Sequence, residues 1–293
     1  MNSFITHTLM MLEDMGMSIR YPDIRHVTFS DDGTSTVHMS FCCMTGNRVS
    51  IEHNQQMKFM MIFTVLDFFI DTKYPELEGL SFAQKYRQIP CDNDKELMLR
   101  ELYRVAKVIR NSIVHSPSSF DMSGNHLNVD YQFRSTDFSL KISFDALMYF
   151  YTSLVMFSKG DLGDGNYFLG IIRSLYSNVV SGIVCFSDEF GSQLNMPSDG
   201  LKIKPYVREI VMHPDYEVED GQVKIKFNER NTPEWQGMDF YIEYNGAGIL
   251  VPMEALMSDF TIGEQDLINN WRHSHPFPPL KKTSNNALQR TSS

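Results

Sequence analysis

The sequence predicts a mixed α+β fold, because two kinds of apolar periodicity occupy separate parts of the chain. Between residues 54 and 187, apolar residues recur mainly at steps of three and four, the spacing of helices that bury one face. Before and after this region, and in one stretch inside it, apolar and polar residues alternate, as in half-buried strands. We therefore expect a helical bundle with inserted β-hairpins, followed by a small antiparallel β module.

The composition fits a globular protein and excludes some classes of function. With 293 residues, of which 42% are apolar, the chain is long enough to bury a substantial core. The formal net charge of -10 argues against a protein that coats nucleic acid non-specifically, because phosphate binding uses clustered Lys and Arg. This charge still allows an enzyme with a local basic site.

Cysteine usage and the apolar segments indicate a cytoplasmic protein that does not span a membrane. The 4 cysteines form no C-x-x-C pair, so we expect neither a zinc site nor a disulfide framework, and a reducing compartment fits best. The first residues lack the basic start and the continuous apolar run of a signal peptide. The most apolar segment, Phe168–Phe186, contains Arg173 near its middle, which favours a buried helix over a membrane-spanning one.

Residues 1–53 predict a helix and a β-hairpin. The helical pattern covers Phe4–Met15, and the hairpin pairs His26–Phe29 with Thr36–Phe41 across the turn Asp31–Thr34. The histidines of this segment are spread over different elements, so no metal site is expected at His7, His26, His38 and His53.

Residues 54–187 predict a helical domain with an inserted hairpin at about 126–143. Ser81 is a suitable N-cap for one short helix in the connector that contains Pro75 and Pro90. Pro117 should end the helix predicted over Glu96–His115. The other expected elements are helices over Met57–Thr72, Glu96–His115, Phe144–Ser158 and Tyr167–Phe186, and hairpin strands over Leu127–Phe133 and Phe138–Ser143.

Residues 188–275 predict a small α+β module, and residues 276–293, which contain Pro and then Ser, Thr and Asn, predict a flexible tail. Turns at Glu219-Asp220-Gly221 and Asn245-Gly246 separate short alternating runs, which indicates a small antiparallel sheet. The expected elements are strands over Tyr206–Val211, Gln222–Phe227, Phe240–Tyr244 and Gly248–Val251, a helix over Met253–Phe260 and a short helix that ends near Trp271.

The helix predicted over Glu96–His115 contains the candidate functional residues. Its apolar stripe is Met98, Leu102, Val105, Ile109 and Ile113, and its polar stripe, expected to face solvent, is Arg100, Arg104, Lys107, Asn111 and His115. Arg110 lies between the two stripes. An imidazole beside a guanidinium and a carboxamide suits phosphodiester chemistry, because the imidazole can move a proton and the guanidinium can bind phosphate. The same residue types are also ordinary on a solvated helix face, and a His near a helix C-terminus is favoured by the helix dipole.

The segment from Arg110 to His115, Arg-Asn-Ser-Ile-Val-His, resembles the Arg-polar-x-x-x-His motif of the HEPN superfamily of helical domains. The preceding chain is similar as well, over about residues 54–160. The similar elements are an apolar helix at Phe59–Ile70, the segment Lys73–Leu77, the helix start Ser81-Phe82 and the triplet Glu101-Leu102-Tyr103.

This resemblance implies a metal-independent endoribonuclease without a cofactor. His115 would act as general acid or base on RNA, Arg110 would neutralise the phosphate, and Asn111 would orient His115 or the phosphate. Arg104 and Lys107, on the polar stripe, are expected to add weaker RNA contacts. The resemblance also implies a homodimer whose two motifs share one cleft, and a toxin–antitoxin or anti-phage setting in which an antitoxin or regulatory protein is a partner.

Two other functions remain open from the sequence. The chain could be a catalytically inactive HEPN-like scaffold whose C-terminal module binds another protein, a reading that its acidic balance supports and the intact Arg110, Asn111 and His115 oppose. A nucleotide-binding or nucleotide-modifying role is weaker, because the sequence contains no phosphate-cradling glycine loop.

Overall fold

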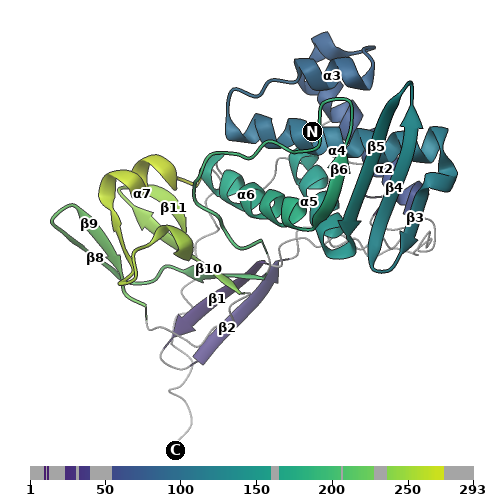
Figure 1. Ribbon diagram of the computed structural model, residues 1–293. Helices are drawn as coiled ribbons and strands as arrows, with labels where there is room; N and C mark the ends of the chain where they lie inside the picture. The colour runs from purple at the N-terminus through teal and green to yellow at the C-terminus, as the bar shows by residue number, and fades with distance from the viewer. Residues whose placement is uncertain are drawn as a thin grey trace, which may run out of the picture.

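The computed structural model describes residues 55–159, 165–205, 207–227 and 236–273, with Met10, Leu12 and the backbone of 24–30 and 33–39. Within these ranges the chain has the expected α+β fold, with a helical part and a C-terminal sheet at opposite ends of the molecule (Figure 1). Apart from Met10 and Leu12, the helix predicted over Phe4–Met15 lies outside the described residues, as does the tail 276–293.

The helical part is built around one long helix, α4 (Asp94–His115), which confirms the helix predicted over Glu96–His115. It packs against α2 (Gln55–Lys73), α3 (Phe82–Gln88), α5 (Phe144–Lys159) and α6 (Gly165–Ser181). From Met98 to Ile109 every residue of α4 except Arg100 is buried. The helix is therefore enclosed on all sides over this length, and its polar stripe is not the solvated face that the sequence suggested.

A four-stranded antiparallel sheet covers one side of α4, in the order β3-β4-β5-β6. The predicted hairpin is confirmed as β4 (His126–Phe133) and β5 (Thr136–Ser143), and β3 (Phe120–Ser123) pairs with β4. The register runs from His126 opposite Ser143 to Phe133 opposite Thr136. His126 and the β4–β5 turn therefore lie at opposite ends of this strand pair.

The helix predicted over Tyr167–Phe186 is wrong at its end. It stops at Ser181, and β6 (Ile183–Ser187) then pairs with β5 as the edge strand of this sheet. Gly182 makes the change of direction possible, because a Cβ at this position would overlap the Cβ of Ala146 in α5. The apolar run predicted a continuous helix because strand and buried helix look alike over so short a segment.

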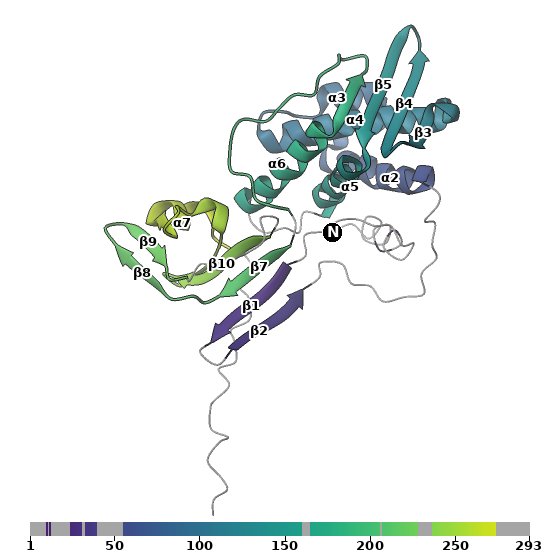
Figure 2. The same cartoon turned by 60° about the horizontal axis from the view of Figure 1, so that its bottom comes forward.

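The C-terminal part contains a five-stranded sheet in the order β11-β10-β7-β1-β2. Figure 2 shows four of these strands, β10, β7, β1 and β2, in this order. Its strands are β11 (Ala247–Pro252), β10 (Gly237–Tyr244), β7 (Arg208–Met212), β1 (Ile24–Ser30) and β2 (Gly33–Met39). The pairs β1–β2 and β10–β11 are antiparallel as expected, whereas β7 is parallel to both of its neighbours. The N-terminal hairpin thus belongs to the same sheet as the C-terminal strands.

A second, three-stranded sheet completes the C-terminal part, with β12 (Thr261–Gly263), β9 (Gln222–Ile225) and β8 (Tyr216–Glu219), followed by α7 (Glu264–Asn270). The helix predicted over Met253–Phe260 is wrong: only a 3-10 turn forms at Met253–Ala255. Phe260 has a positive φ of 63°, and its ring packs edge-on against those of Phe227 and Phe240. This aromatic packing holds the segment in a turn, and sequence periodicity does not reveal it.

A buried charge cluster joins the helical part to the C-terminal sheet. Arg208 of β7 bonds Asp239 of β10 at 2.6 Å and Glu254 at 2.8 Å, and the Tyr167 hydroxyl of α6 donates to Asp239 at 2.7 Å. Burial raises the pKa of the Tyr167 phenol, which keeps it a donor. No described helix has both the length and the apolar content to cross a membrane.

Candidate functional site

The candidate site lies at the C-terminal end of α4, where the chain leaves the enclosed core. Ser116 and Pro117 end the helix as predicted, and a 3-10 turn follows at Pro117–Ser119. Leu102, Val105 and Ile109 are fully buried, whereas the motif side chains emerge beyond them. His115 is exposed, as predicted for the polar stripe, whereas Arg110 and Asn111 are half-buried.

Arg110 connects the two other motif residues. Its Nη1 lies 3.2 Å from Asn111 Oδ1 and 3.2 Å from His115 Nε2. A guanidinium can only donate hydrogen bonds, so Nε2 must be the acceptor, and the proton of a neutral His115 ring must be on Nδ1. Neither Nε nor Nη2 of Arg110 donates to any other residue in the described part of the chain. The guanidinium thus holds the imidazole and keeps donors for an anion.

The aromatic ring of Phe82, in the first turn of α3, supports the Arg110 side chain. The guanidinium carbon lies 4.8 Å from the centre of this ring, a cation–π contact. The helix start that positions Phe82 is a capping box: Ser81 Oγ accepts from Gln84 N at 3.4 Å, and Ser81 N donates to Gln84 Oε1 at 3.1 Å. The predicted N-cap is confirmed, and it belongs to the support of the site.

Ser81→Ala is expected to lower the free energy of unfolding by about 0.5–2 kcal/mol, because the first turn of α3 loses its cap. Urea unfolding followed by circular dichroism measures this change. Ser118→Ala, at an exposed serine in the turn after α4, is the matched control and should leave the unfolding midpoint nearly unchanged. Equal midpoints for the two variants would contradict the capping role.

Tyr131 of β4 contacts α4 beside the motif, from the sheet side. Its hydroxyl donates to Val108 O at 3.4 Å. Burial raises the pKa of this phenol, so the hydroxyl stays protonated and remains a donor. The Asn111 amide is held by Arg110, whose Nη1 donates to Oδ1. No spacing in the sequence identified Tyr131 or Phe82, because both lie on other elements.

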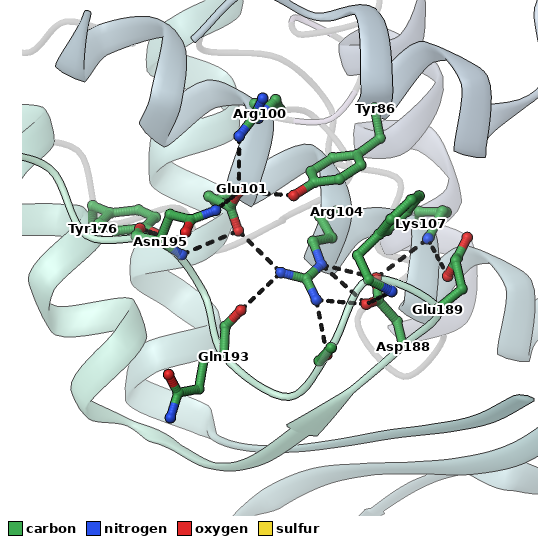
Figure 3. Close-up of polar contacts among 12 residues, drawn as sticks. Tyr86, Arg100, Glu101, Arg104, Lys107, Tyr176, Asp188, Glu189, Gln193 and Asn195 are labelled. Carbon is green, nitrogen blue, oxygen red and sulfur yellow. Dashed lines mark hydrogen bonds and ion pairs between the residues drawn. The ribbon is translucent and has the colours of Figure 1, made fainter.

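The auxiliary RNA contacts predicted at Arg104 and Lys107 are wrong. Their side chains are only 2% and 1% exposed and lie in an ion-pair network with the segment after β6 (Figure 3). Arg104 bonds both oxygens of Asp188, at distances down to 2.6 Å, and Lys107 Nζ lies 2.6 Å from Glu189. Arg104 also donates to the carbonyl groups of Gly191 and Gln193 and to Glu101. Both cations are thus used inside the protein and cannot reach RNA.

The same network binds the segment after β6, from Asp188 to Asn195, to the side of α4. Glu101, fully buried, accepts from the Tyr86 hydroxyl at 3.0 Å and from Asn195 Nδ2 at 2.9 Å (Figure 3). Burial, together with the neighbouring Glu101, raises the pKa of Tyr86 to about 12. Every charged group of this buried network has partners, so its physical role is to hold α4 in place.

Metal ligands are not assembled in the described ranges: no three His, Cys, Asp or Glu side chains there are grouped as an ion would require. The chemistry available at the end of α4 is that of a guanidinium with free donors, an imidazole with an accepting nitrogen and a fixed amide. Comparisons of this chain with protein-family models, curated proteins and solved structures found no match.

Proposed function

We propose that this protein is a HEPN-type, metal-independent endoribonuclease whose site is Arg110, Asn111 and His115. The observation that supports it most is the geometry at the end of α4, where one guanidinium lies 3.2 Å from the accepting nitrogen of an exposed imidazole and retains unused donors. The proposal includes the fold, in which α2, α4, α5 and α6 would form a HEPN-like bundle with strands β3, β4 and β5 inserted between α4 and α5.

The reaction follows from these groups. Arg110 binds a phosphate of RNA through Nε and Nη2, as a planar fork suits two phosphate oxygens. The hydrogen bond from Arg110 Nη1 occupies the lone pair of His115 Nε2, so Arg110 must first turn from the imidazole to the phosphate. Nε2 then takes the proton of the adjacent ribose 2′-hydroxyl as the 2′-oxygen attacks phosphorus and the bond to the 5′-oxygen breaks. The products are a 2′,3′-cyclic phosphate and a 5′-hydroxyl end, once the leaving oxygen has received a proton. Asn111 keeps Arg110 aligned throughout.

A homodimer would supply the group that protonates the leaving oxygen. One chain provides one imidazole at this site, and a second copy with its own His115 could fill the complementary role of acid. In this proposal the protein acts in the cytoplasm as a toxin restrained by an antitoxin, or as an anti-phage effector. The acidic C-terminal part would then bind the regulatory partner.

The decisive experiment is incubation of the purified protein with labelled RNA in the presence of EDTA. We expect cleavage that leaves cyclic phosphate ends, and cleavage at least about a hundredfold slower by His115→Ala. A substrate with a single 2′-deoxyribose at the cleaved linkage should stay intact there, since the attacking atom is missing. Cleavage at that deoxy position would exclude the mechanism.

Arg110→Lys is expected to reduce kcat/KM nearly as much as Arg110→Ala does. An ammonium is a point charge that cannot offer two parallel donors to a phosphate or stay flat on the Phe82 ring. Steady-state kinetics of the two variants on the same RNA measure the effect. Arg87→Lys, at an exposed arginine of α3, is the matched control and should behave as the wild type. Full activity of Arg110→Lys would show that only charge is needed.

A second candidate function is an inactive HEPN-like scaffold. The burial of Arg104 and Lys107 favours it, because it removes two cations from the surface that RNA would contact in a chain whose net charge is already -10. A scaffold would leave labelled RNA intact under all conditions, and the kinetic experiment above therefore separates the two functions.

A further inference from the structure

An exposed aromatic side chain lies beside the candidate site on the tip of the inserted hairpin. Phe133, the last residue of β4, is 51% exposed. Its ring and the His115 ring are nearly parallel, with centroids 6.4 Å apart and an interplanar angle of 20°. Exposing the Phe133 ring to water is unfavourable, so its position beside His115, the proposed general base, needs a physical reason.

The strand pattern shows that Phe133 occupies the inward-facing side of β4. Leu127, Val129 and Tyr131, at alternate positions before it, are all buried. Phe133 continues this series beyond the edge of the core, where about half of its surface is exposed. The inward side of the strand therefore ends in a half-exposed aromatic ring next to His115.

The Phe133 ring lies at the end of a packed hairpin. Tyr131 and Phe138, directly opposite each other on β4 and β5, stack with centroids 4.9 Å apart and planes 1° apart. The turn residues Arg134 and Ser135 both have positive φ, as a two-residue hairpin turn requires. The Arg134 guanidinium carbon lies 5.2 Å from the centre of the Phe133 ring. An aromatic ring and an exposed cation thus occupy the same tip.

We propose that Phe133 and Arg134 form a platform for one unpaired nucleobase of the RNA, next to the linkage that His115 attacks. Aromatic rings stack on any base that is free of pairing, and arginine adds a contact to the neighbouring phosphate or to the base. A base inside a duplex cannot reach the ring without unstacking. The platform therefore selects single-stranded RNA, an inference that rests on the proposed function of the same site.

The test is binding of a labelled single-stranded DNA oligonucleotide to the protein. Such DNA keeps the bases and phosphates of RNA and lacks the attacking 2′-hydroxyl. Fluorescence anisotropy should show that Phe133→Leu raises Kd about 5- to 150-fold, the loss expected for one stacked base. Phe133→Tyr should bind like the wild type, since a ring is retained. Met257→Ala, at an exposed apolar residue of the C-terminal part, is the control and should leave Kd unchanged.

Two further readouts decide the outcome. Phe133→Trp should show quenching of indole fluorescence on binding, beyond any quenching in the wild type. The preference for the single strand over the same sequence as a duplex should fall in Phe133→Leu. Absence of oligonucleotide binding by the wild type, or equal affinities and preferences for Phe133→Leu and the wild type, would overturn the platform.

This experiment is independent of catalysis. If the wild type cleaves RNA but its affinity for the oligonucleotide does not depend on Phe133, the nuclease function is supported and the platform is excluded. If binding depends on the Phe133 ring but the protein never cleaves RNA, the platform is supported as a binding site and the nuclease function is excluded.

Discussion

His115→Ala is expected to lower the rate of RNA cleavage by about 10²- to 10⁴-fold, the usual contribution of a general acid or base. In the proposed reaction the proton acceptor is His115 Nε2, which lies 3.2 Å from the guanidinium that would bind the phosphate, and alanine provides no acceptor there. The side chain is exposed, so the free energy of unfolding should change by less than about 0.5 kcal/mol. Single-turnover cleavage and urea unfolding measure the two effects.

The control for this variant is His126→Ala. His126 lies at the other end of β4 from Phe133 and contacts the carbonyl of Gly124, so its removal should leave cleavage unchanged. Comparable activity of His115→Ala and His126→Ala would place catalysis elsewhere in the molecule. A loss of activity accompanied by a large loss of stability would show that His115 supports the fold instead.

Asp188→Ala is expected to lower the free energy of unfolding by about 3–5 kcal/mol, the usual cost of removing one partner of a buried ion pair. Asp188 accepts from Arg104 at 2.6 Å, from Lys107 at 3.3 Å and from the backbone N–H of Phe190 at 2.8 Å. Its removal leaves a fully buried guanidinium without its bidentate partner. Denaturant unfolding monitored by circular dichroism measures the loss.

An exposed pair provides the matched comparison. Glu217 lies 2.6 Å from Lys226, a distance equal to that between Arg104 and Asp188, but the side chains are 64% and 52% exposed. Glu217→Ala should therefore leave the free energy of unfolding nearly unchanged, because water screens the pair and replaces its hydrogen bonds. Similar losses for the two variants would contradict the role assigned to burial.

The sequence predicted those elements whose signals are local. The capping serine, the period of α4, the proline that ends it and the alternation of β4 and β5 each depend on residues within a few positions of one another. These features needed no knowledge of the rest of the chain. The polar stripe of α4 was a less reliable signal: it predicted the exposed His115 correctly, but it also placed Arg104 and Lys107 at the surface, and both are buried.

The errors have a different cause, which is pairing between segments distant in sequence. Arg104 and Lys107 look like surface residues until Asp188 and Glu189 are placed against them. The last turn expected for α6 became β6 because β5 offers an unpaired edge. Phe82 and Tyr131 contact α4 at the motif from α3 and β4, and only the folded structure brings them to it.

The position of β1 in the C-terminal sheet affects how the helical part can move. In the chain, the helical part is an insertion between β2 and β7, and both of these strands belong to one sheet. The chain therefore leaves one sheet before the helical part and returns to the same sheet after it, and Ile24 of β1 lies opposite Arg208 of β7. Two connections to one sheet disfavour free rotation about a single linker. During synthesis β1 can pair with β7 only after the whole insertion has been made, so we expect this long-range pairing to form late in folding.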